Sequence, residues 1–209
     1  LSVHLALSGS ISYKARPAEL TRTFKVDLGP TRPEGWSALW SAVDAGEVPE
    51  PVCLSASIPT VYDPLHAPDG GNTVVLWAPV PYEVGGQGVD GWDDVKDRFR
   101  DACVERFKEV VDLSKGTILN AEVISPADTD RHVGNLDKGA VHMGEIIYRR
   151  ADYFSSIPEL ANYRTPIEGL YYCGSCTHPG GGVIGATAYH AVNVIADDLG
   201  LEKWWAKGD

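Results

Sequence analysis

The segment from residue 168 to residue 200 constrains the fold most, because it is predicted to run from a strand through a glycine-rich turn into a helix. A buried strand is expected at "EGLYYCGS" (168–175), followed by the turn "THPGGG" (177–182) and an apolar, alanine-rich helix (183–199). Glycine lets a backbone approach a ligand closely, and the first N–H groups of a helix lack partners within it. The pattern therefore favours an anionic or electron-rich ligand. Spacing alone also fits an ordinary helix that starts after a tight turn.

Four other segments are predicted to be strands. Residues 1–8, "LSVHLALS", alternate apolar and polar side chains, as a half-buried strand does. Residues 52–59 and 73–81 are joined by the turn-rich stretch 63–72, which predicts antiparallel neighbours in one sheet. A last strand is expected at 116–126.

Two helices are predicted before the glycine-rich turn. One is short, at 36–46, and ends at Gly46. The other lies between residues 91 and 113, where steps of three or four residues form one apolar stripe of Trp92, Val95, Phe99, Cys103, Phe107, Val110 and Val111. Residues 128–146 are expected to form a long polar loop.

Composition limits the partners of the chain. Its 209 residues carry a formal net charge of −11, which argues against nucleic acid and anionic lipid, since both bind clustered Lys and Arg. The longest apolar run, around 183–196, is too short and too interrupted for a transmembrane segment. Four cysteines are too few for a disulfide scaffold, which predicts a reducing cytoplasm. Small molecules or other proteins are the expected partners.

Three stretches resemble the phytoene desaturase-like FAD-dependent oxidoreductases, which are relatives of the flavin amine oxidases. They are "SIPTVYDPLHAPDGGNTVVLWAPVPYEV" (57–84), "VISPADTDRHVGNLDKGAVHMGEI" (123–146) and "YRTPIEGLYYCGSCTHPGGGVIGATAYHA" (163–191). The resemblance implies an α/β fold in two parts. Residues 1–165 would form an α+β substrate-binding domain with a mixed sheet. Residues 166–209 would complete a Rossmann-like FAD-binding domain supplied mainly by another chain or by a missing N-terminal half.

The resemblance also implies which residues bind FAD. Gly174 and Ser175, at the strand end, would lie near the pyrophosphate. The rest of the turn would run along the flavin ring, and its N–H groups would stabilise the negative charge of a reduced flavin. These residues are Thr177, His178, Pro179, Gly180, Gly181, Gly182 and Val183. No metal is expected.

Two histidines and one cysteine pair are open to more than one interpretation. His178 could fix the turn beside the flavin or transfer a proton, and His142 could face the flavin or the substrate, or be a hydrogen-bonded structural residue. They are the candidate catalytic residues, although hydride removal need not require a base. Cys173 and Cys176 form a CxxC pair, for which a buried Cys173 in a strand and a small Cys176 under the turn are expected rather than a zinc or thiol-redox site.

The chain lacks the βαβ unit with G-x-G-x-x-G that opens an FAD site. We therefore expect either the C-terminal product of a longer enzyme or a subunit whose FAD-binding half is a separate polypeptide. The predicted function is that of a half of an FAD-dependent dehydrogenase or oxidase that removes hydride from an apolar or conjugated small molecule, with residues 73–84 and 128–146 near the substrate. The alternatives are half of an amine or amino-acid oxidase, a non-catalytic structural partner, and a thiol-redox protein.

Overall fold

The computed structural model describes residues 1–14, 23–139, 160, 162–175, 177–182 and 185–206. They divide into two compact units, residues 1–134 and residues 135–209, and each is described by itself. We predicted a domain boundary between residues 165 and 166, and this stays a prediction.

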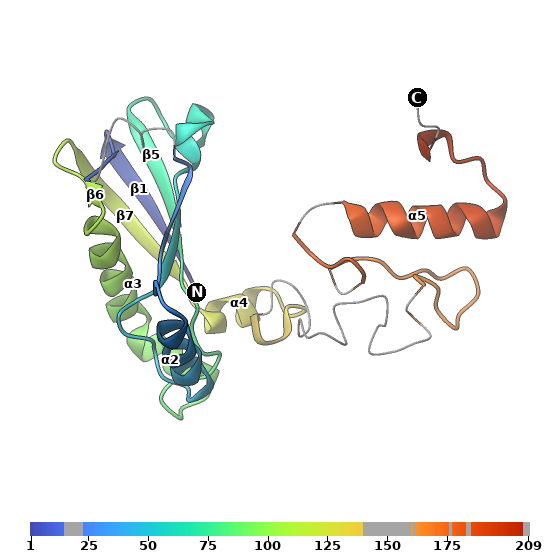
Figure 1. Cartoon of the computed structure of the whole chain (residues 1–209), viewed down its shortest axis with the longest axis horizontal. Coiled ribbons are helices and arrows are strands. Elements are labelled where there is room, and N and C mark those ends of the chain that lie inside the picture. The colour runs from blue at the N-terminus through green and yellow to red at the C-terminus, as the bar shows by residue number, and fades with distance from the viewer. Residues whose placement is uncertain (15–22, 140–159, 161, 176, 183–184, 207–209) are drawn as a thin grey trace. The chain divides into compact units, whose positions relative to one another are not determined.

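A five-stranded sheet forms the centre of the first unit, in the order β3-β4-β5-β1-β7 (Figure 1). The predicted pairing of two neighbouring strands is confirmed, because β4 lies antiparallel to β5 with Ala56 opposite Leu76. Central β1 pairs with β5 on one side and with β7 on the other. The strands are β1 (Ser2–Gly9), β3 (Lys25–Leu28), β4 (Leu54–Ser57), β5 (Gly71–Trp77) and β7 (Gly116–Ile124).

Every strand pair in the described residues is antiparallel, so the sheet is not mixed as expected. The link from β4 to β5 reverses the chain without a crossover, and α3 returns it to β7 beside β1. Strand β3 was not predicted. A second ladder pairs β2 (Ser12–Tyr13) with β6 (Val111–Asp112). The prediction of a fold that combines helices and strands is confirmed.

The ladder between β1 and β7 contains one irregularity. Ala6 lies opposite Asn120, but the next residue, Leu7, lies opposite Ile118. Leu119 is thus an extra residue on β7, as in a β-bulge. Its side chain is exposed, whereas Ile118 packs against the core.

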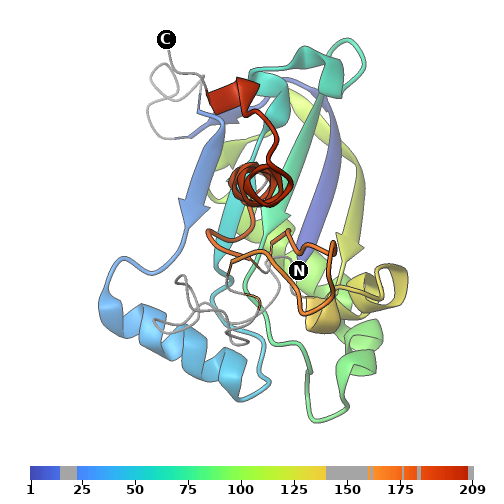
Figure 2. The same ribbon diagram turned by 90° about the vertical axis from the view of Figure 1, so that its right-hand side faces the viewer.

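Helix α3 (Trp92–Lys108) packs against one face of the sheet, and the two views in Figures 1 and 2 show it beside the strands. The predicted apolar stripe is confirmed as far as Phe107, because Trp92, Phe99, Cys103 and Phe107 are buried. Its last part is wrong, because the helix ends at Lys108 and Val110 and Val111 lie beyond it. The indole Nε1 of Trp92 donates hydrogen bonds to the carbonyls of Pro81 and Tyr82, which satisfies its one polar atom. The alternating strand residues Val3, Leu5, Leu7, Val74 and Leu76 complete this core.

Helix α2 (Pro33–Asp44) confirms the short helix predicted at 36–46, with an earlier start at Pro33. Five one-turn 3₁₀ segments complete the described elements: η1 (Pro59–Val61), η2 (Pro64–His66), η3 (Val89–Gly91), η4 (Asp137–Gly139) and η6 (Trp204–Ala206).

The predicted loop at 128–146 is wrong in its first part, because helix α4 (Pro126–His132) occupies it. A capping box starts this helix: the Ser125 hydroxyl accepts a hydrogen bond from Asp128 N, and the Asp128 carboxylate accepts one from Ser125 N at 2.9 Å. Two otherwise unpaired N–H groups are satisfied, which makes a helix more stable than a loop. Residues 140–146 lie outside the described residues.

In the second unit, α5 (Ala186–Leu199) confirms the helix predicted at 183–199 and ends at Gly200, whose backbone is left-handed. The buried strand predicted at 168–175 is wrong. Its described residues make one isolated bridge, between Arg164 and Tyr171, and the Leu170 side chain is 50% exposed. A strand depends on neighbours in a sheet for stability, and this segment has one bridging partner within the described part of the unit.

No helix among the described residues is both long enough and apolar enough to cross a membrane.

Candidate flavin site and substrate face

Two consecutive turns form the glycine-rich segment. The Thr177 N–H and the Thr177 hydroxyl both donate to the carbonyl of Gly174, at 3.0 and 2.8 Å. The Gly180 N–H then donates to the carbonyl of Thr177 at 2.7 Å. Thr177 is buried, whereas Gly174, Ser175 and His178 are more accessible. Its side chain therefore fixes the backbone before the glycines begin.

Two of the glycines leave their backbone open to a ligand. Gly174 has a φ of 133° and Gly180 a φ of 101°, values that residues with a side chain rarely adopt. Apart from the glycine itself and its two chain neighbours, no described residue has an atom within 4 Å of where a Cβ would stand at either position. A flat group can therefore come against the main chain here, which fits the flavin that the sequence predicts.

Helix α5 starts at Ala186, with Gly185 as its N-cap residue. No side chain of the described residues caps its N-terminus, and its first turn has no acidic residue. The N–H groups of the first turn are thus free of side-chain partners in this part of the structure, and the positive end of the helix dipole faces the turn. A group that gains negative charge would be stabilised at this place. A flavin gains negative charge when it is reduced.

The structure brings most of the predicted cofactor residues together in this turn: Gly174, Ser175, Thr177, His178, Pro179, Gly180, Gly181 and Gly182. Val183, the candidate His142 and the second cysteine, Cys176, lie outside the described residues. The imidazole of His178 is exposed, while its carbonyl accepts a hydrogen bond from Tyr163. Cys173 is exposed, so the expectation of a buried strand cysteine is wrong.

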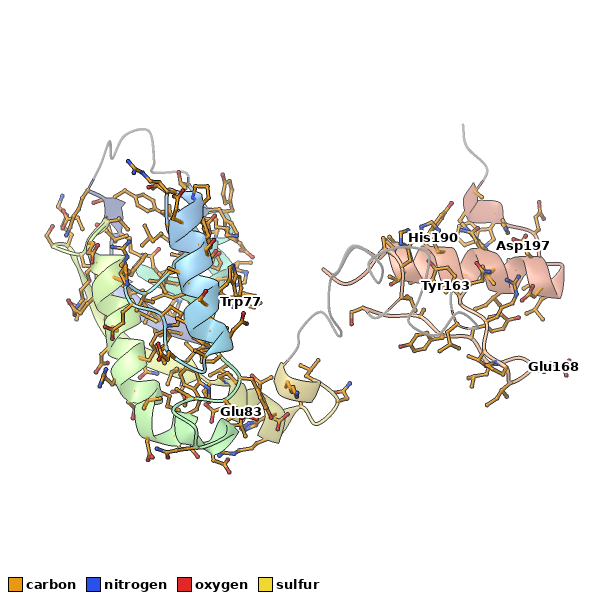
Figure 3. The ribbon with its side chains drawn as sticks, turned by 60° about the horizontal axis from the view of Figure 1, so that its bottom comes forward. Trp77, Glu83, Tyr163, Glu168, His190 and Asp197 are labelled. Atoms are coloured by element: carbon orange, nitrogen blue, oxygen red, sulfur yellow. The ribbon has the colours of Figure 1, made fainter. Side chains whose placement is uncertain are left out.

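Tyr163 was not predicted as part of the site. Its hydroxyl donates to the His178 carbonyl at 2.5 Å, and its ring stacks on the imidazole of His190 in α5 (Figure 3). No spacing in the sequence indicates a contact between residues 163 and 178, since both belong to irregular segments.

The adjacent aromatic residues Trp204 and Trp205 pack in part against their own unit, because Trp205 Nε1 donates to Asn193 Oδ1 at 3.2 Å.

The sheet face of the first unit that α3 leaves open includes part of the segment predicted to lie near the substrate. Trp77 and Val75 of β5 lie beside Ser2 and His4 of β1 in the register. Trp77 is 51% exposed, and the small residue Ala6 is exposed on the same face. His4 Nε2 lies 3.1 Å from the Ser2 hydroxyl. The face is therefore partly apolar, but the register also places hydrogen-bonding side chains on it: Ser2, His4, Ser55, Ser57, Asn120 and Glu122.

Among the described residues, no group of three or more His, Cys, Asp and Glu side chains is arranged to hold a metal ion.

Comparison with curated proteins finds several similar oxidoreductases. The chain is 32% identical over 152 residues to pyridine nucleotide-disulfide oxidoreductase domain-containing protein 2 of Rattus norvegicus, covering 70% of this chain and 25% of the rat protein. It is 28% identical over 214 aligned positions to a limonene dehydrogenase subunit of Castellaniella defragrans, covering 99% of this chain and 38% of that protein.

A third relative is the neurosporene-forming phytoene desaturase of Rhodobacter capsulatus, 29% identical over 140 residues, which cover 66% of this chain and 25% of the desaturase. No protein-family model matches the sequence. The chain thus spans between a quarter and two fifths of the length of these relatives. By these similarities, the chain belongs to the phytoene desaturase-like oxidoreductases.

Proposed function

We propose that this chain forms part of an FAD-dependent dehydrogenase or oxidase, in which the turn from Gly174 to Gly185 contacts the cofactor. The observation that carries the proposal is the open backbone at Gly174 and Gly180, where no described residue beyond the two chain neighbours has an atom within 4 Å of the Cβ position. The turn stands immediately before the N-terminus of α5, which no described side chain caps. Because the relatives of this chain are oxidoreductases, a redox cofactor is the ligand that we propose for this turn.

The residues of the turn have distinct roles in this proposal. Gly174 and Ser175 would hold the pyrophosphate, and the main chain of Gly180, Gly181 and Gly182 would lie against the flavin ring. FAD, when bound, accepts the hydride that leaves the substrate. The N–H groups at the start of α5 would stabilise the negative charge that follows, because they are already oriented and need no rearrangement. Val183 would continue this wall, and His142 and His178 remain the candidate proton-transfer groups.

The spacing G-x-G-x-x-G occurs at residues 86–91 and 180–185, but every strand pair in the described residues is antiparallel, so these residues form no βαβ unit. A second polypeptide segment is therefore needed to complete such a site. One side of α5 supports this requirement. Apolar side chains recur on it at helical spacing, and most are exposed: Ala188, Val192, Ile195 and Leu199. We propose that this side packs against the nucleotide-binding half, whether that half is part of the same gene product or of another polypeptide. The limonene dehydrogenase relative is named as a subunit, which agrees with a multi-part enzyme.

The substrate is proposed to be an apolar or conjugated hydrocarbon. Limonene and phytoene, which give their names to relatives of this chain, are both hydrocarbons. The open sheet face with Trp77, Val75 and Ala6 offers apolar contact surface for such a molecule. Residues 128–146 would lie near it as well. The proposed setting is the cytoplasm, which rests on the small number of cysteines.

The experiment compares two glycine substitutions in the complete native protein that contains this chain. Gly180→Ala adds a methyl group where the flavin would lie. Gly169→Ala is the matched control. Gly169 also has a positive φ, 74°, and no described residue beyond its chain neighbours has an atom within 4 Å of its Cβ position, but it lies outside the turn. The purified proteins are compared by visible absorption, which detects bound flavin by its yellow colour.

We expect the unmodified protein and the Gly169→Ala control to be yellow, and Gly180→Ala to lose most of its flavin. Both substitutions strain a left-handed backbone, so the difference between them reports the ligand contact rather than the strain. Equal flavin content in all three proteins would contradict the proposed contact. A colourless unmodified protein would contradict FAD dependence itself.

A further inference from the structure

Tyr163 contacts the residue before and the helix after residues 179–185, which we call the glycine-rich loop. Its hydroxyl donates a 2.5 Å hydrogen bond to the carbonyl of His178, the last residue before Pro179 and the three glycines. Its ring stacks on the imidazole of His190, in the second turn of α5, with ring centroids 6.2 Å apart and planes inclined by 23°. Figure 3 shows Tyr163 and His190 side by side on the second unit. One side chain therefore joins the residue that enters the loop to the helix that leaves it.

Tyr163 is itself held firmly. The residue is 8% exposed, and its carbonyl accepts a hydrogen bond from the Tyr172 N–H at 2.8 Å. Its own N–H donates to the carbonyl of Leu160. Its φ is 62°, in the left-handed region that aromatic residues rarely adopt. Such a conformation persists only where the surroundings determine it, and it is characteristic of functional sites.

Four of the five described residues of this loop are glycines: Gly180, Gly181, Gly182 and Gly185. Glycines lose more conformational freedom on ordering than other residues, and they supply no side chains to pack. The turn from Gly174 to Gly180 is fixed by Thr177, but His178 itself is exposed. The Tyr163 hydroxyl on its carbonyl therefore adds a second restraint, beside that of Thr177, at the point where the glycines begin.

We propose that Tyr163 is a positioning residue that presets the glycine-rich loop for its cofactor. It acts through the main-chain carbonyl of His178 and through His190, without touching the cofactor. This inference rests on the proposed function, since that function assigns the loop to FAD. It adds a residue of the irregular segment before the turn to the machinery of the site.

The test compares two tyrosine-to-phenylalanine substitutions in the complete native protein. Tyr163→Phe keeps the ring and its stacking but removes the hydroxyl from His178. Tyr171→Phe is the matched control, because its hydroxyl also makes a hydrogen bond in the second unit, to Asp198 at 3.0 Å, away from the loop. Amide hydrogen exchange is measured by mass spectrometry on peptides that span residues 174–185. The rate of flavin release and the position of the visible flavin band are measured on the same samples.

We expect Tyr163→Phe to raise exchange at the loop amides about fivefold, the effect of losing one hydrogen bond. Flavin release should accelerate by a similar factor, and the flavin band should shift because the groups around the ring have moved. Tyr171→Phe should leave the loop amides, the release rate and the band as in the unmodified protein. Unchanged exchange at residues 174–185 in Tyr163→Phe would overturn the inference. Faster exchange across the whole second unit would also overturn it, because the hydroxyl would then serve the fold and not the loop.

The same data separate the inference from the proposed function. A protein without flavin, in which Tyr163→Phe still loosens the loop and Tyr171→Phe does not, would refute FAD dependence while supporting the action of Tyr163 on the loop. A protein that contains flavin, and in which Tyr163→Phe leaves hydrogen exchange at residues 174–185 unchanged, would support FAD dependence and refute the action of Tyr163 on the loop.

Discussion

Asp198 accepts two hydrogen bonds from the guanidinium of Arg164, at 2.8 Å from Nε and 2.7 Å from Nη2. The Tyr171 hydroxyl donates a third, at 3.0 Å. These contacts fasten the last turn of α5 to both sides of the chain reversal between residues 164 and 171. The helix that begins at the candidate flavin turn is thereby held at its other end.

The first prediction concerns the pH dependence of this contact. The hydrogen bonds from Arg164, and then that from Tyr171, lower the pKa of Asp198 below its ordinary value of about 4. A carboxyl whose pKa is lower in the folded state stabilises the fold above its unfolded pKa, and this contribution is lost as the pH falls through its folded pKa. Asp198→Asn should therefore lower the thermal unfolding temperature at pH 7 and have a much smaller effect at strongly acidic pH.

The control for this prediction is Asp69→Asn, at an exposed position between β4 and β5. It should leave the unfolding temperature nearly unchanged at both pH values. An Asp198→Asn effect of equal size at neutral and acidic pH would show that the charge of Asp198 does not contribute.

The second prediction concerns the capping box of α4. Ser125 is fully buried, and its hydroxyl accepts the Asp128 N–H and donates to the Asp128 carboxylate at 2.8 Å. Ser125→Ala should lower the free energy of unfolding by about 1 kcal/mol, the usual value of an N-cap. Urea denaturation measures the change. Ser41→Ala, at an exposed position inside α2, should change it by less than about 0.5 kcal/mol, and equal losses in the two variants would contradict the capping role.

The third prediction concerns the core under α3. Phe107 has no exposed surface and packs within the main apolar cluster. Phe107→Ala should lower the free energy of unfolding by about 3–5 kcal/mol, because it removes buried apolar area and leaves a cavity. Leu65→Ala, at a residue that is 92% exposed in η2, is the comparison and should cost less than about 0.5 kcal/mol in the same urea titration. A small loss for Phe107→Ala would mean that α3 does not form this core.

The fourth prediction concerns cysteine reactivity. Burial raises the pKa of the Cys103 thiol to about 12, so only about 10⁻⁴ of it is thiolate at pH 8. Burial also raises the pKa of Cys53, whereas Cys173 is exposed. Iodoacetamide at pH 8 should therefore modify Cys173 in the native protein and reach Cys103 only after unfolding. Peptide mass mapping over time decides this, and labelling of Cys103 as fast as Cys173 would show the assigned burial to be wrong.

Much of the first unit could be predicted because its pattern is local. The alternation in residues 1–8 matches β1, in which Val3, Leu5 and Leu7 are buried, and the apolar stripe of residues 92–107 matches α3. Strand β3 could not be found in this way. Its four residues, Lys25–Leu28, are only half-buried at best, and their pairing with β4 is what makes them a strand.

Helix α4 could have been predicted from its own residues. Ser125, Pro126 and Asp128 have the spacing of a capping box with proline at the first helical position, but the polar composition of the segment indicated a loop. The segment 168–175 failed for the opposite reason. Its apolar residues match a strand, but a strand also requires partners, which no local pattern can supply.

The candidate site could also be predicted only in part, where its pattern is local. Glycines and a following helix are visible in sequence, so the turn at 174–182 could be located. The contacts of Tyr163 with His178 and of Arg164 with Asp198 join residues 15 and 34 positions apart, and neither interval belongs to a regular element that would bring them together. Only a folded chain shows such pairs.

The extra residue in β7 gives that strand an uneven tolerance of changes in length. Because Leu119 has no partner on β1, its removal would restore a regular ladder with Ile118 still facing the core and Asn120 still facing outward. Loss of one residue elsewhere in the strand, such as Ala121, would instead turn every following or preceding side chain to the opposite face. In a set of related chains, single-residue gaps in this strand should therefore gather at position 119, where the sheet can absorb them without exchanging its inner and outer surfaces.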